Sequence, residues 1–402
     1  GYRVIDLGTM VPLQQYIDTA KEHHAHAIGM SALLVQTSNH MITVSRMMQE
    51  QDLDIPVLIG GAPVSDRHAA YVAMAGHDDR AAIRSDVFYC RTAMDGVNIM
   101  NKLRSGEDLG ALLQRNKEKL LRKLDHAEKK AAEEQELLAT LPRRKVVMNG
   151  FRLPEAPRFA RQRYQYTLRE FVSHIDKKTL FSLNWRFGTS SARARTGHTS
   201  EELEALFEKW VERATKYEWI RPQGVAGIFP CQAEGDVIVV YDPHDLSREI
   251  ARFDFTVVIG AGRQDLVSGA QYFHSRASGA MSACGIQLTT SGPQVDAVLA
   301  DIKASGDSES HLFLQGLSDR IAEDMAEHLN NEQRRLLGLD PGQGQRWSPG
   351  YPGMRNIELN KTIHELLAGA ELLGVHLTSA GEFSPTGTTG AVVSYHPEAR
   401  YT

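Results

Sequence analysis

The chain has 402 residues, of which 42% are hydrophobic and 24% charged, ordinary values for a globular protein and enough for two or three domains. It carries 45 Lys and Arg against 50 Asp and Glu, a net charge of −5 that argues against a general nucleic-acid binder, because such a protein has a basic surface. Its 3 cysteines are too few for a disulfide framework and predict a reducing, cytoplasmic compartment. The longest apolar stretch, Ala27–Val35, is far shorter than the about 18–20 residues of a membrane span, so we expect no membrane partner.

The first hundred residues alternate between strand and helix patterns. The chain begins at Gly1 without an initiator methionine and enters a strand-like run almost at once, so we expect a fragment of a longer protein. The predicted strands are Val4–Leu7, Ala27–Val35, Ile55–Ile59 and Val87–Cys90, and the predicted helices are Leu13–His24, Thr37–Gln51, Ser65–Ala75 and Met94–Leu103. This alternation predicts an α/β domain over residues 1–104 with a flavodoxin-like (Rossmann-like) parallel sheet, in which Ala27–Val35 is buried on both faces. Ligands of such sheets bind at the carboxyl ends of the strands.

Residues 105–150 form a charged segment. Arg115–Glu136 is rich in both basic and acidic residues, contains neither Gly nor Pro, and carries only a thin stripe of leucines. This pattern predicts a solvated helix with i,i+4 ion pairs, which serves as a linker and as a candidate hinge arm between two domains.

Residues 151–402 predict a mixed α+β domain. Glu234-Gly235-Asp236 separates two strand patterns and indicates a hairpin, and Gly338–Gly353 is a Gly/Pro-rich loop. The predicted helices are Glu201–Tyr217, Leu312–Leu336 and Lys361–Leu373, and the predicted strands are Val225–Phe229, Val237–Tyr241 and Ala391–Ser394.

Small residues follow two neighbouring strands of the first predicted sheet. Ser31 ends one strand and offers a hydroxyl, and Gly60-Gly61 ends the next and permits close approach of a ligand to the backbone. The alternative is an ordinary turn between strand and helix. The residues alone leave both interpretations open.

Two other segments have functional alternatives. Gly260-Ala261-Gly262 after an apolar run is similar to the start of a dinucleotide fingerprint, but Asp265 stands where a third glycine is needed, and we expect no nucleotide there. His23, His24 and His26 do not share a helix face and favour a solvated helix end over a metal site. No Ser/His/Asp or Cys/His set has the spacing of a nucleophilic site, so we predict no catalytic residue and no metal ligand.

The loop around Arg346 combines a guanidinium, an indole and a phenol within Arg346-Trp347-Ser348-Pro349-Gly350-Tyr351. An arginine can hold a carboxylate through two hydrogen bonds, and aromatic rings can stack on a flat ring or a cation. The alternative is a surface loop whose aromatic residues fill the core. A second segment, His396–Tyr401, has a similar polar and aromatic character.

Several of these motifs, taken in order, resemble the C-terminal portion of cobalamin-dependent methionine synthase. The resemblance rests on Val4–Pro12, Ile28–Leu33, Ile55–Ala62, Gly224–Pro230, Arg346-x-x-Pro349-Gly350-Tyr351-Pro352 and His396-Pro397-x-Ala399-x-Tyr401. It implies a truncated cobalamin-binding domain (1–104), a charged helical linker (105–150) and an activation domain that binds S-adenosylmethionine (151–402). Phe253–Thr290 matches poorly, and nothing is carried over there.

The resemblance also implies the site residues of the first domain. Cobalamin would insert its nucleotide tail near Ser31, Leu33, Val35, Gly60, Gly61 and Ala93, with Ser31 bonding the displaced base. Val35 stands where the family usually has Thr. The family's cobalt-ligating histidine lies in Asp-x-His-x-x-Gly, which this sequence lacks, so no histidine is assigned as a metal ligand.

For the second domain the resemblance implies S-adenosylmethionine contacts at Asp176, Glu327, Arg346, Tyr351, Tyr401 and Thr402. Arg346 would hold the carboxylate of the ligand. Asp176 matches an acid near its amino group, although the residues that follow need a one-residue gap. Tyr401 and Thr402 match an aromatic and backbone contact at the end of the chain.

The function implied is that of a methionine synthase fragment. The whole enzyme transfers a methyl group from 5-methyltetrahydrofolate to homocysteine through methylcobalamin, and this portion would bind cobalamin and S-adenosylmethionine and support reductive remethylation of cob(II)alamin. The implied partners are a flavodoxin-type electron donor and the upstream homocysteine and folate modules, which alone would need zinc. The alternative is a non-catalytic module or carrier for a corrinoid or S-adenosylmethionine. A generic flavodoxin-like receiver is disfavoured, because the strand ends carry Ser31 and Gly60-Gly61 instead of acids.

Overall fold

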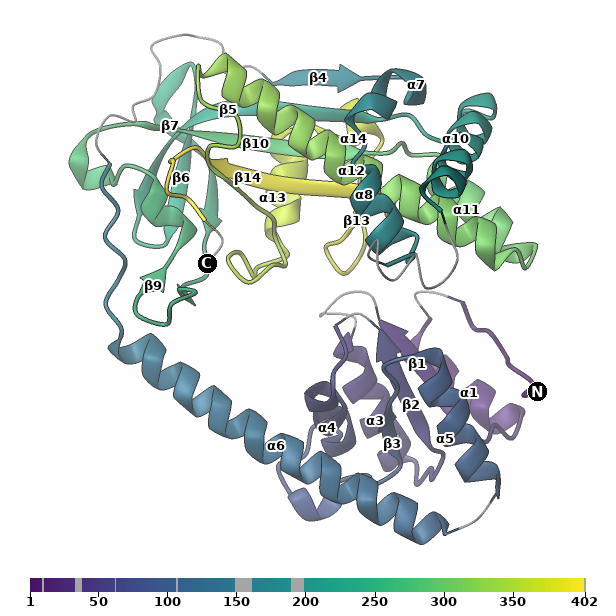
Figure 1. The fold of residues 1–402 in the computed structure, drawn as a ribbon. Coiled ribbons are helices and arrows are strands. Elements are labelled where there is room, and N and C mark those ends of the chain that lie inside the picture. Colours follow the sequence, from purple (N-terminus) through teal and green to yellow (C-terminus); the bar gives the residue numbers. More distant parts are fainter. Residues whose placement is uncertain are drawn as a thin grey trace. The chain divides into compact units, whose positions relative to one another are not determined.

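The chain forms two compact units, Gly1–Ala139 and Thr140–Thr402 (Figure 1). The computed structural model describes residues 1–8, 11–32, 38–61, 63–105, 108–148, 161–188 and 199–400. Each unit has its own sheet and its own hydrophobic core.

The first unit is built on a parallel sheet, which confirms the predicted fold class. Its strands are β1 (Ile28–Ala32), β2 (Val57–Gly61) and β3 (Val87–Tyr89), in the order β1-β2-β3. The helices around them are α1 (Leu13–Glu22), α3 (His40–Glu50), α4 (Asp66–Met74) and α5 (Ala93–Ser105), with a short 3-10 turn at Arg80–Ala82. Ser65 caps α4, because its side chain accepts a hydrogen bond from the backbone N–H of His68.

Two expectations for this unit are wrong. Val4–Leu7 belongs to no strand, and Val4 is 81% exposed, since an apolar β-branched run becomes a strand only where a partner strand offers hydrogen bonds. β1 is buried on one face only, because Ile28, Met30 and Ala32 face the core while its alternate residues are exposed.

The charged segment forms one helix, α6 (Leu109–Thr140), that packs on the first unit instead of being solvated along its whole length. Leu120 and Leu124 are buried in the core of that unit. The Asn116 side chain donates hydrogen bonds to the carbonyl oxygens of Ser85 and Val87, both at 2.8 Å. The thin leucine stripe and one asparagine therefore attach the helix to the sheet.

The second unit contains a seven-stranded antiparallel sheet in the order β11-β14-β10-β5-β6-β7, with β4 also paired to β5. Its strands are β4 (Gln162–Gln165), β5 (Gln223–Glu234), β6 (Val237–Asp242), β7 (Asp245–Asp254), β10 (Ser282–Thr290), β11 (Gln345–Trp347) and β14 (Thr388–Ser394). Two short ladders stand apart, β8 (Val258–Ile259) with β9 (Leu266–Val267) and β12 (His376–Leu377) with β13 (Phe383–Ser384). The predicted hairpin is confirmed, because β5 and β6 pair across Gly235, whose φ is +66°.

Helices cover both faces of this sheet. On one face lie α7 (Leu168–Phe171), α10 (Ser200–Lys216), α11 (Val295–Ala304) and α12 (Ser308–Leu336), and on the other α13 (Leu359–Leu366) and α14 (Gly369–Leu373). Neighbouring residues of β5 divide between the two cores, since Val225 packs with α13 and Ala226 with α12. Three short turns, α8 (Lys177–Thr179), Val172–His174 and Leu180–Asn184, connect to the α12 side.

The structure corrects the predicted helix Lys361–Leu373. It is split into α13 and α14 because Ala368 adopts a left-handed conformation with φ +51°. The expected loop Gly338–Gly353 also contains β11, which adds an edge strand to the sheet.

Candidate functional site

The carboxyl edge of the first sheet gathers several of the predicted cobalamin residues. Ser31 lies opposite Gly60 in the parallel register of β1 and β2, and Gly61 follows at the strand end. Ala93 begins α5, directly beyond the carboxyl end of β3. Ser31, Gly61 and Ala93 are exposed, so the edge is open to a ligand. Leu33 and Val35 lie outside the described residues.

The fold itself explains the two glycines. A Cβ on Gly60 would lie 2.8 Å from the carbonyl oxygen of Cys90 on the neighbouring segment. At Gly61 a Cβ would overlap the carbonyl oxygen of Ala32, and φ is +114°, a conformation that side chains disfavour. Strand packing therefore requires glycine here, while ligand contact at this edge stays a prediction.

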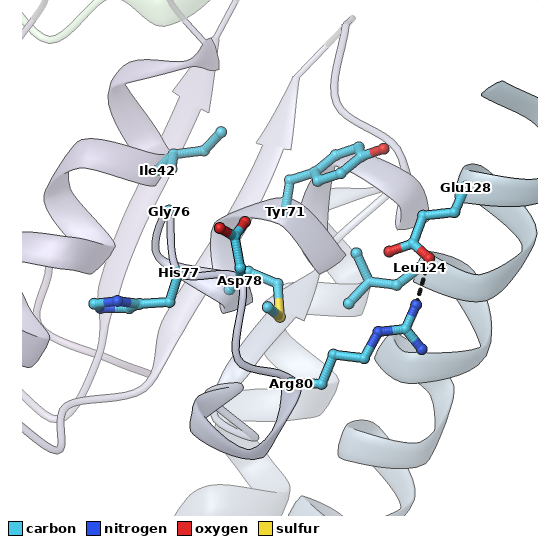
Figure 2. A pocket seen from close by; sticks show the side chains of 9 residues that line it. Ile42, Tyr71, Gly76, His77, Asp78, Arg80, Leu124 and Glu128 are labelled. Atoms are coloured by element: carbon cyan, nitrogen blue, oxygen red, sulfur yellow. Dashed lines mark hydrogen bonds and ion pairs between the residues drawn. The ribbon is translucent and has the colours of Figure 1, made fainter. Parts of the chain in front are cut away.

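A separate pocket of about 250 Å³ lies elsewhere in the first unit (Figure 2). Its lining includes the apolar Ile42 and Met74 and the charged Arg80, which pairs with Asp125 and Glu128 of α6. Because α4 runs back from the carboxyl end of β2, its own end and this pocket lie towards the amino ends of the strands. None of the predicted site residues lines it.

In the second unit, Arg346 is held by the edge strand β11. Its neighbour Trp347 is buried, and the Trp347 indole donates a 3.0 Å hydrogen bond to the Ser394 hydroxyl. Side chains alternate along a strand, so the Arg346 side chain emerges on the opposite face, where α12 lies. There its Nη2 is 2.9 Å from Oε2 of Glu323, and its Nε is 3.8 Å from Oε2 of Glu327.

Tyr351 lies beside the same charges, although it is 57% exposed. Burial of its hydroxyl raises the pKa of Tyr351, the negative charge of Glu323 raises it further, and Arg346 acts in the opposite sense. The structure therefore brings three predicted residues, Glu327, Arg346 and Tyr351, to one stretch of α12.

Asp176 joins this stretch through its backbone. Its N–H donates a 2.8 Å hydrogen bond to Oδ2 of Asp324 on α12, and its carboxylate caps α8 by accepting from the Thr179 N–H and hydroxyl. The Thr179 bonds lower the pKa of Asp176, whereas burial raises the pKa of Asp324. Part of the acceptor capacity of Asp176 is thus used within the chain. Tyr401 and Thr402 lie outside the described residues.

Sequence reasoning missed Glu323, the carboxylate nearest to Arg346. It lies one turn before Glu327 on α12 and so shares its helix face, but a 3.6-residue period cannot tell which of two such acids a distant loop will meet. The second polar and aromatic segment begins at His396. This residue is buried, and its ring nitrogen lies 3.1 Å from the carbonyl oxygen of Val147.

The glycine-rich segment before Asp265 has a different structural setting from a dinucleotide fingerprint. Gly260-Ala261-Gly262 connects β8 to β9, an antiparallel pair without an intervening helix, and Asp265 binds Arg144. In the described ranges no group of three or more His, Cys, Asp or Glu side chains could hold a metal ion. Among the described helices, none is long and apolar enough to cross a membrane.

Comparisons with known proteins point to the same two parts of the chain. The family model for the activation domain of vitamin B12 dependent methionine synthase matches residues 167–402, and that for the B12 binding domain matches residues 1–85. Methionine synthases of Mycobacterium leprae and Mycobacterium tuberculosis are 25% and 24% identical over the whole of this chain, which spans 36% of their length. A crystal structure of the MetH reactivation domain bound to AdoHcy is similar in fold, with a TM-score of 0.57 and 22% identity over 64% of this chain and 85% of that one.

Proposed function

The chain belongs to the family of vitamin B12 dependent methionine synthase activation domains, and on that basis we propose that it is the cobalamin-binding and reactivating portion of such an enzyme. In this proposal the first unit holds cobalamin and the second holds S-adenosylmethionine, which serves as the methyl donor when the cofactor must be remethylated. The whole enzyme would transfer a methyl group from 5-methyltetrahydrofolate to homocysteine.

The carboxyl edge of the first sheet suits cobalamin. The Ser31 hydroxyl is exposed there and can donate to a nitrogen of a displaced base, with Gly60, Gly61 and Ala93 leaving the backbone accessible beside it. Leu33 and Val35 would complete this contact. When bound, cobalamin supplies a cobalt centre that accepts the methyl group, and the protein holds the reactants in place.

The contact between Arg346 and Glu323 is the observation that carries the proposal for S-adenosylmethionine. A guanidinium and a carboxylate 2.9 Å apart present one donor group and one acceptor group side by side. Such a pair is complementary to an amino acid end, since Arg346 can bind the ligand's carboxylate and Glu323 can accept from its ammonium group. Glu327 and Tyr351 lie beside this pair, and the Asp176 backbone is bonded to Asp324 on the same helix. Asp176, Tyr401 and Thr402 would add further contacts to the ligand.

Reactivation also needs an electron, and we propose a flavodoxin-type protein as its donor, with the upstream homocysteine and folate modules as covalent partners. A cytoplasmic location fits the free cysteines Cys90, Cys231 and Cys284.

Binding measurements on the full chain test the proposal. Isothermal calorimetry should detect S-adenosylmethionine binding, and the absorbance spectrum of added cob(II)alamin should change on binding and change less with Ser31→Ala. Failure to bind either ligand would contradict the proposal. Binding of both ligands without methyl transfer in the complete enzyme would favour a non-catalytic carrier module.

A further inference from the structure

Glu327 lies between two arginines. Its Oε1 is 2.7 Å from Nη1 of Arg334, and its Oε2 is 3.8 Å from Nε of Arg346. The closer partner, Arg334, is therefore the main counter-charge of Glu327, while Arg346 is paired more closely with Glu323, at 2.9 Å.

Arg334 is a buried cation with three hydrogen bonds. Its side chain is only 5% exposed, and besides Glu327 it donates to Oδ1 of Asn331 and to the carbonyl oxygen of Gln343, each at 2.7 Å. The Gln343 amide in turn donates to the carbonyl oxygen of Tyr395 at 2.8 Å, just after the end of β14. Arg334 thus ties α12 to the segment that leads into β11, the strand that carries Arg346.

Glu323 and Glu327 differ in how firmly their arginine partners hold them. An incoming carboxylate that binds Arg346 at two points competes with Glu323 for Nη2, the donor that already holds the Glu323 carboxylate at 2.9 Å. Glu327 stays with the buried cation, which would otherwise lose its counter-charge at high cost. Glu323 is not paired with Arg334, and its side chain is 39% exposed. It can therefore release Arg346 to the ligand's carboxylate and accept a hydrogen bond from the ligand's ammonium group instead.

We infer that Arg334 is a positioning residue that holds Glu327 and the β11 entry in place, so that a ligand carboxylate exchanges with Glu323 on Arg346. The inference rests on the proposed binding of S-adenosylmethionine, and it adds that the ligand's carboxylate replaces Glu323, and not Glu327, on Arg346. It assigns to Arg334 a role in recognising the ligand's carboxylate, although Arg334 does not touch the ligand.

Two ligands separate this role from general structural support. S-Adenosylmethionine carries the carboxylate, and decarboxylated S-adenosylmethionine is the same sulfonium without it. Calorimetry on the full chain with Arg334→Met should show about tenfold weaker binding of S-adenosylmethionine, the scale of one charge-assisted hydrogen bond. Binding of the decarboxylated ligand should be unchanged or slightly tighter. An equal loss for both ligands, or no loss for either, would overturn the inference.

Two further variants control for charge and for folding. Arg334→Lys keeps the positive charge but cannot reach both Glu327 and the Gln343 carbonyl, so it should restore the preference for the carboxylate only in part. Complete rescue by lysine would show that charge alone matters and would overturn the inference. Arg335→Met removes the exposed neighbouring arginine, paired with Glu332, and should change neither affinity. If Arg334→Met does not fold, Arg334→Lys decides. Wild-type protein that binds neither ligand would instead refute the proposed function itself.

Discussion

Arg144 and Asp265 form a two-point ion pair, with Nε 2.7 Å from Oδ2 and Nη2 2.9 Å from Oδ1. Asp265 is the residue that departs from a dinucleotide fingerprint, and the structure gives it this partner. The backbone of Arg144 also donates to the carbonyl oxygen of Leu266, so the segment that follows α6 is attached to β9.

Breaking this pair should destabilise the second unit. Arg144→Met leaves Asp265 without its guanidinium, and we expect a loss of about 1–2 kcal/mol, modest because both groups stay partly in water. All 4 tryptophans lie in the second unit, so urea unfolding followed by tryptophan fluorescence reports on it. Arg144 lowers the pKa of Asp265 below its ordinary 3.8, so the difference from wild type should disappear as the carboxylate is protonated below about pH 4. A difference that persists in acid would contradict this account.

A side chain at Gly61 should disrupt the first unit. Gly61→Ala places a Cβ against the Ala32 carbonyl oxygen at a φ of +114°, and we expect a loss of at least about 2 kcal/mol. Hydrogen exchange of peptides from β1 and β2 measures it without interference from the second unit. Gly110→Ala is the matched control, because its Cβ would meet open space near the start of α6, and that change should be neutral or slightly stabilising.

Removing the Arg346 guanidinium tests the proposed ligand site. Arg346→Met should weaken S-adenosylmethionine binding by roughly tenfold to a hundredfold, because it deletes the group that binds the ligand's carboxylate. Calorimetry on the full chain gives the ratio. Arg355→Met, an exposed arginine beyond the same loop, should leave the affinity unchanged. Equal affinities of Arg346→Met and wild type would remove Arg346 from the site.

Asp319 on α12 gives a prediction about the pH dependence of stability. Burial raises the pKa of Asp319 from 3.8 to about 6, with Asp296 and Glu323 acting in the same sense. A carboxyl whose pKa is raised on folding favours the folded state at low pH and loses that contribution as pH rises towards 6. Asp319→Asn keeps an acceptor for the Gln315 amide, and it should stabilise the chain by up to about 3 kcal/mol above pH 6 and by little below pH 4. Asp301→Asn on the exposed side of α11 should show no such trend.

Periodicity predicted the parallel sheet of the first unit because its helices and strands alternate with clear patterns. It missed β10, the strand between β5 and β14 in the second sheet. β10 is buried at every position but is built from small and polar residues such as Ser282, Gly285 and Thr290, which carry little hydrophobic signal. The break at Ala368 was missed for another reason. A Cβ at Gly369 would come within 2.7 Å of the Leu288 side chain, and periodicity does not report such close packing against a distant strand.

The sequence predicted those residues of the candidate site that belong to a motif, but not those that only the three-dimensional arrangement brings to the site. Arg346 stands in a distinctive loop, and the structure places it against α12 near Glu327. Glu323 is also a glutamate on the same face of α12. Only the position of β11 shows that Glu323, and not Glu327, lies nearest to Arg346. Arg334 lies near the end of a long helix, where basic residues are common, and only the structure shows that it is buried.

The attachment of α6 to the first sheet has a mechanical consequence. The helix is about 48 Å long at 1.5 Å per residue, and the last of its buried residues is Ala127, about 20 Å before its end at Thr140. A straight rod fixed near its middle is a lever arm. Tilting its base by about 10° would move its end through roughly 3 Å relative to the first sheet, so small adjustments where Asn116 meets β3 are amplified along the helix.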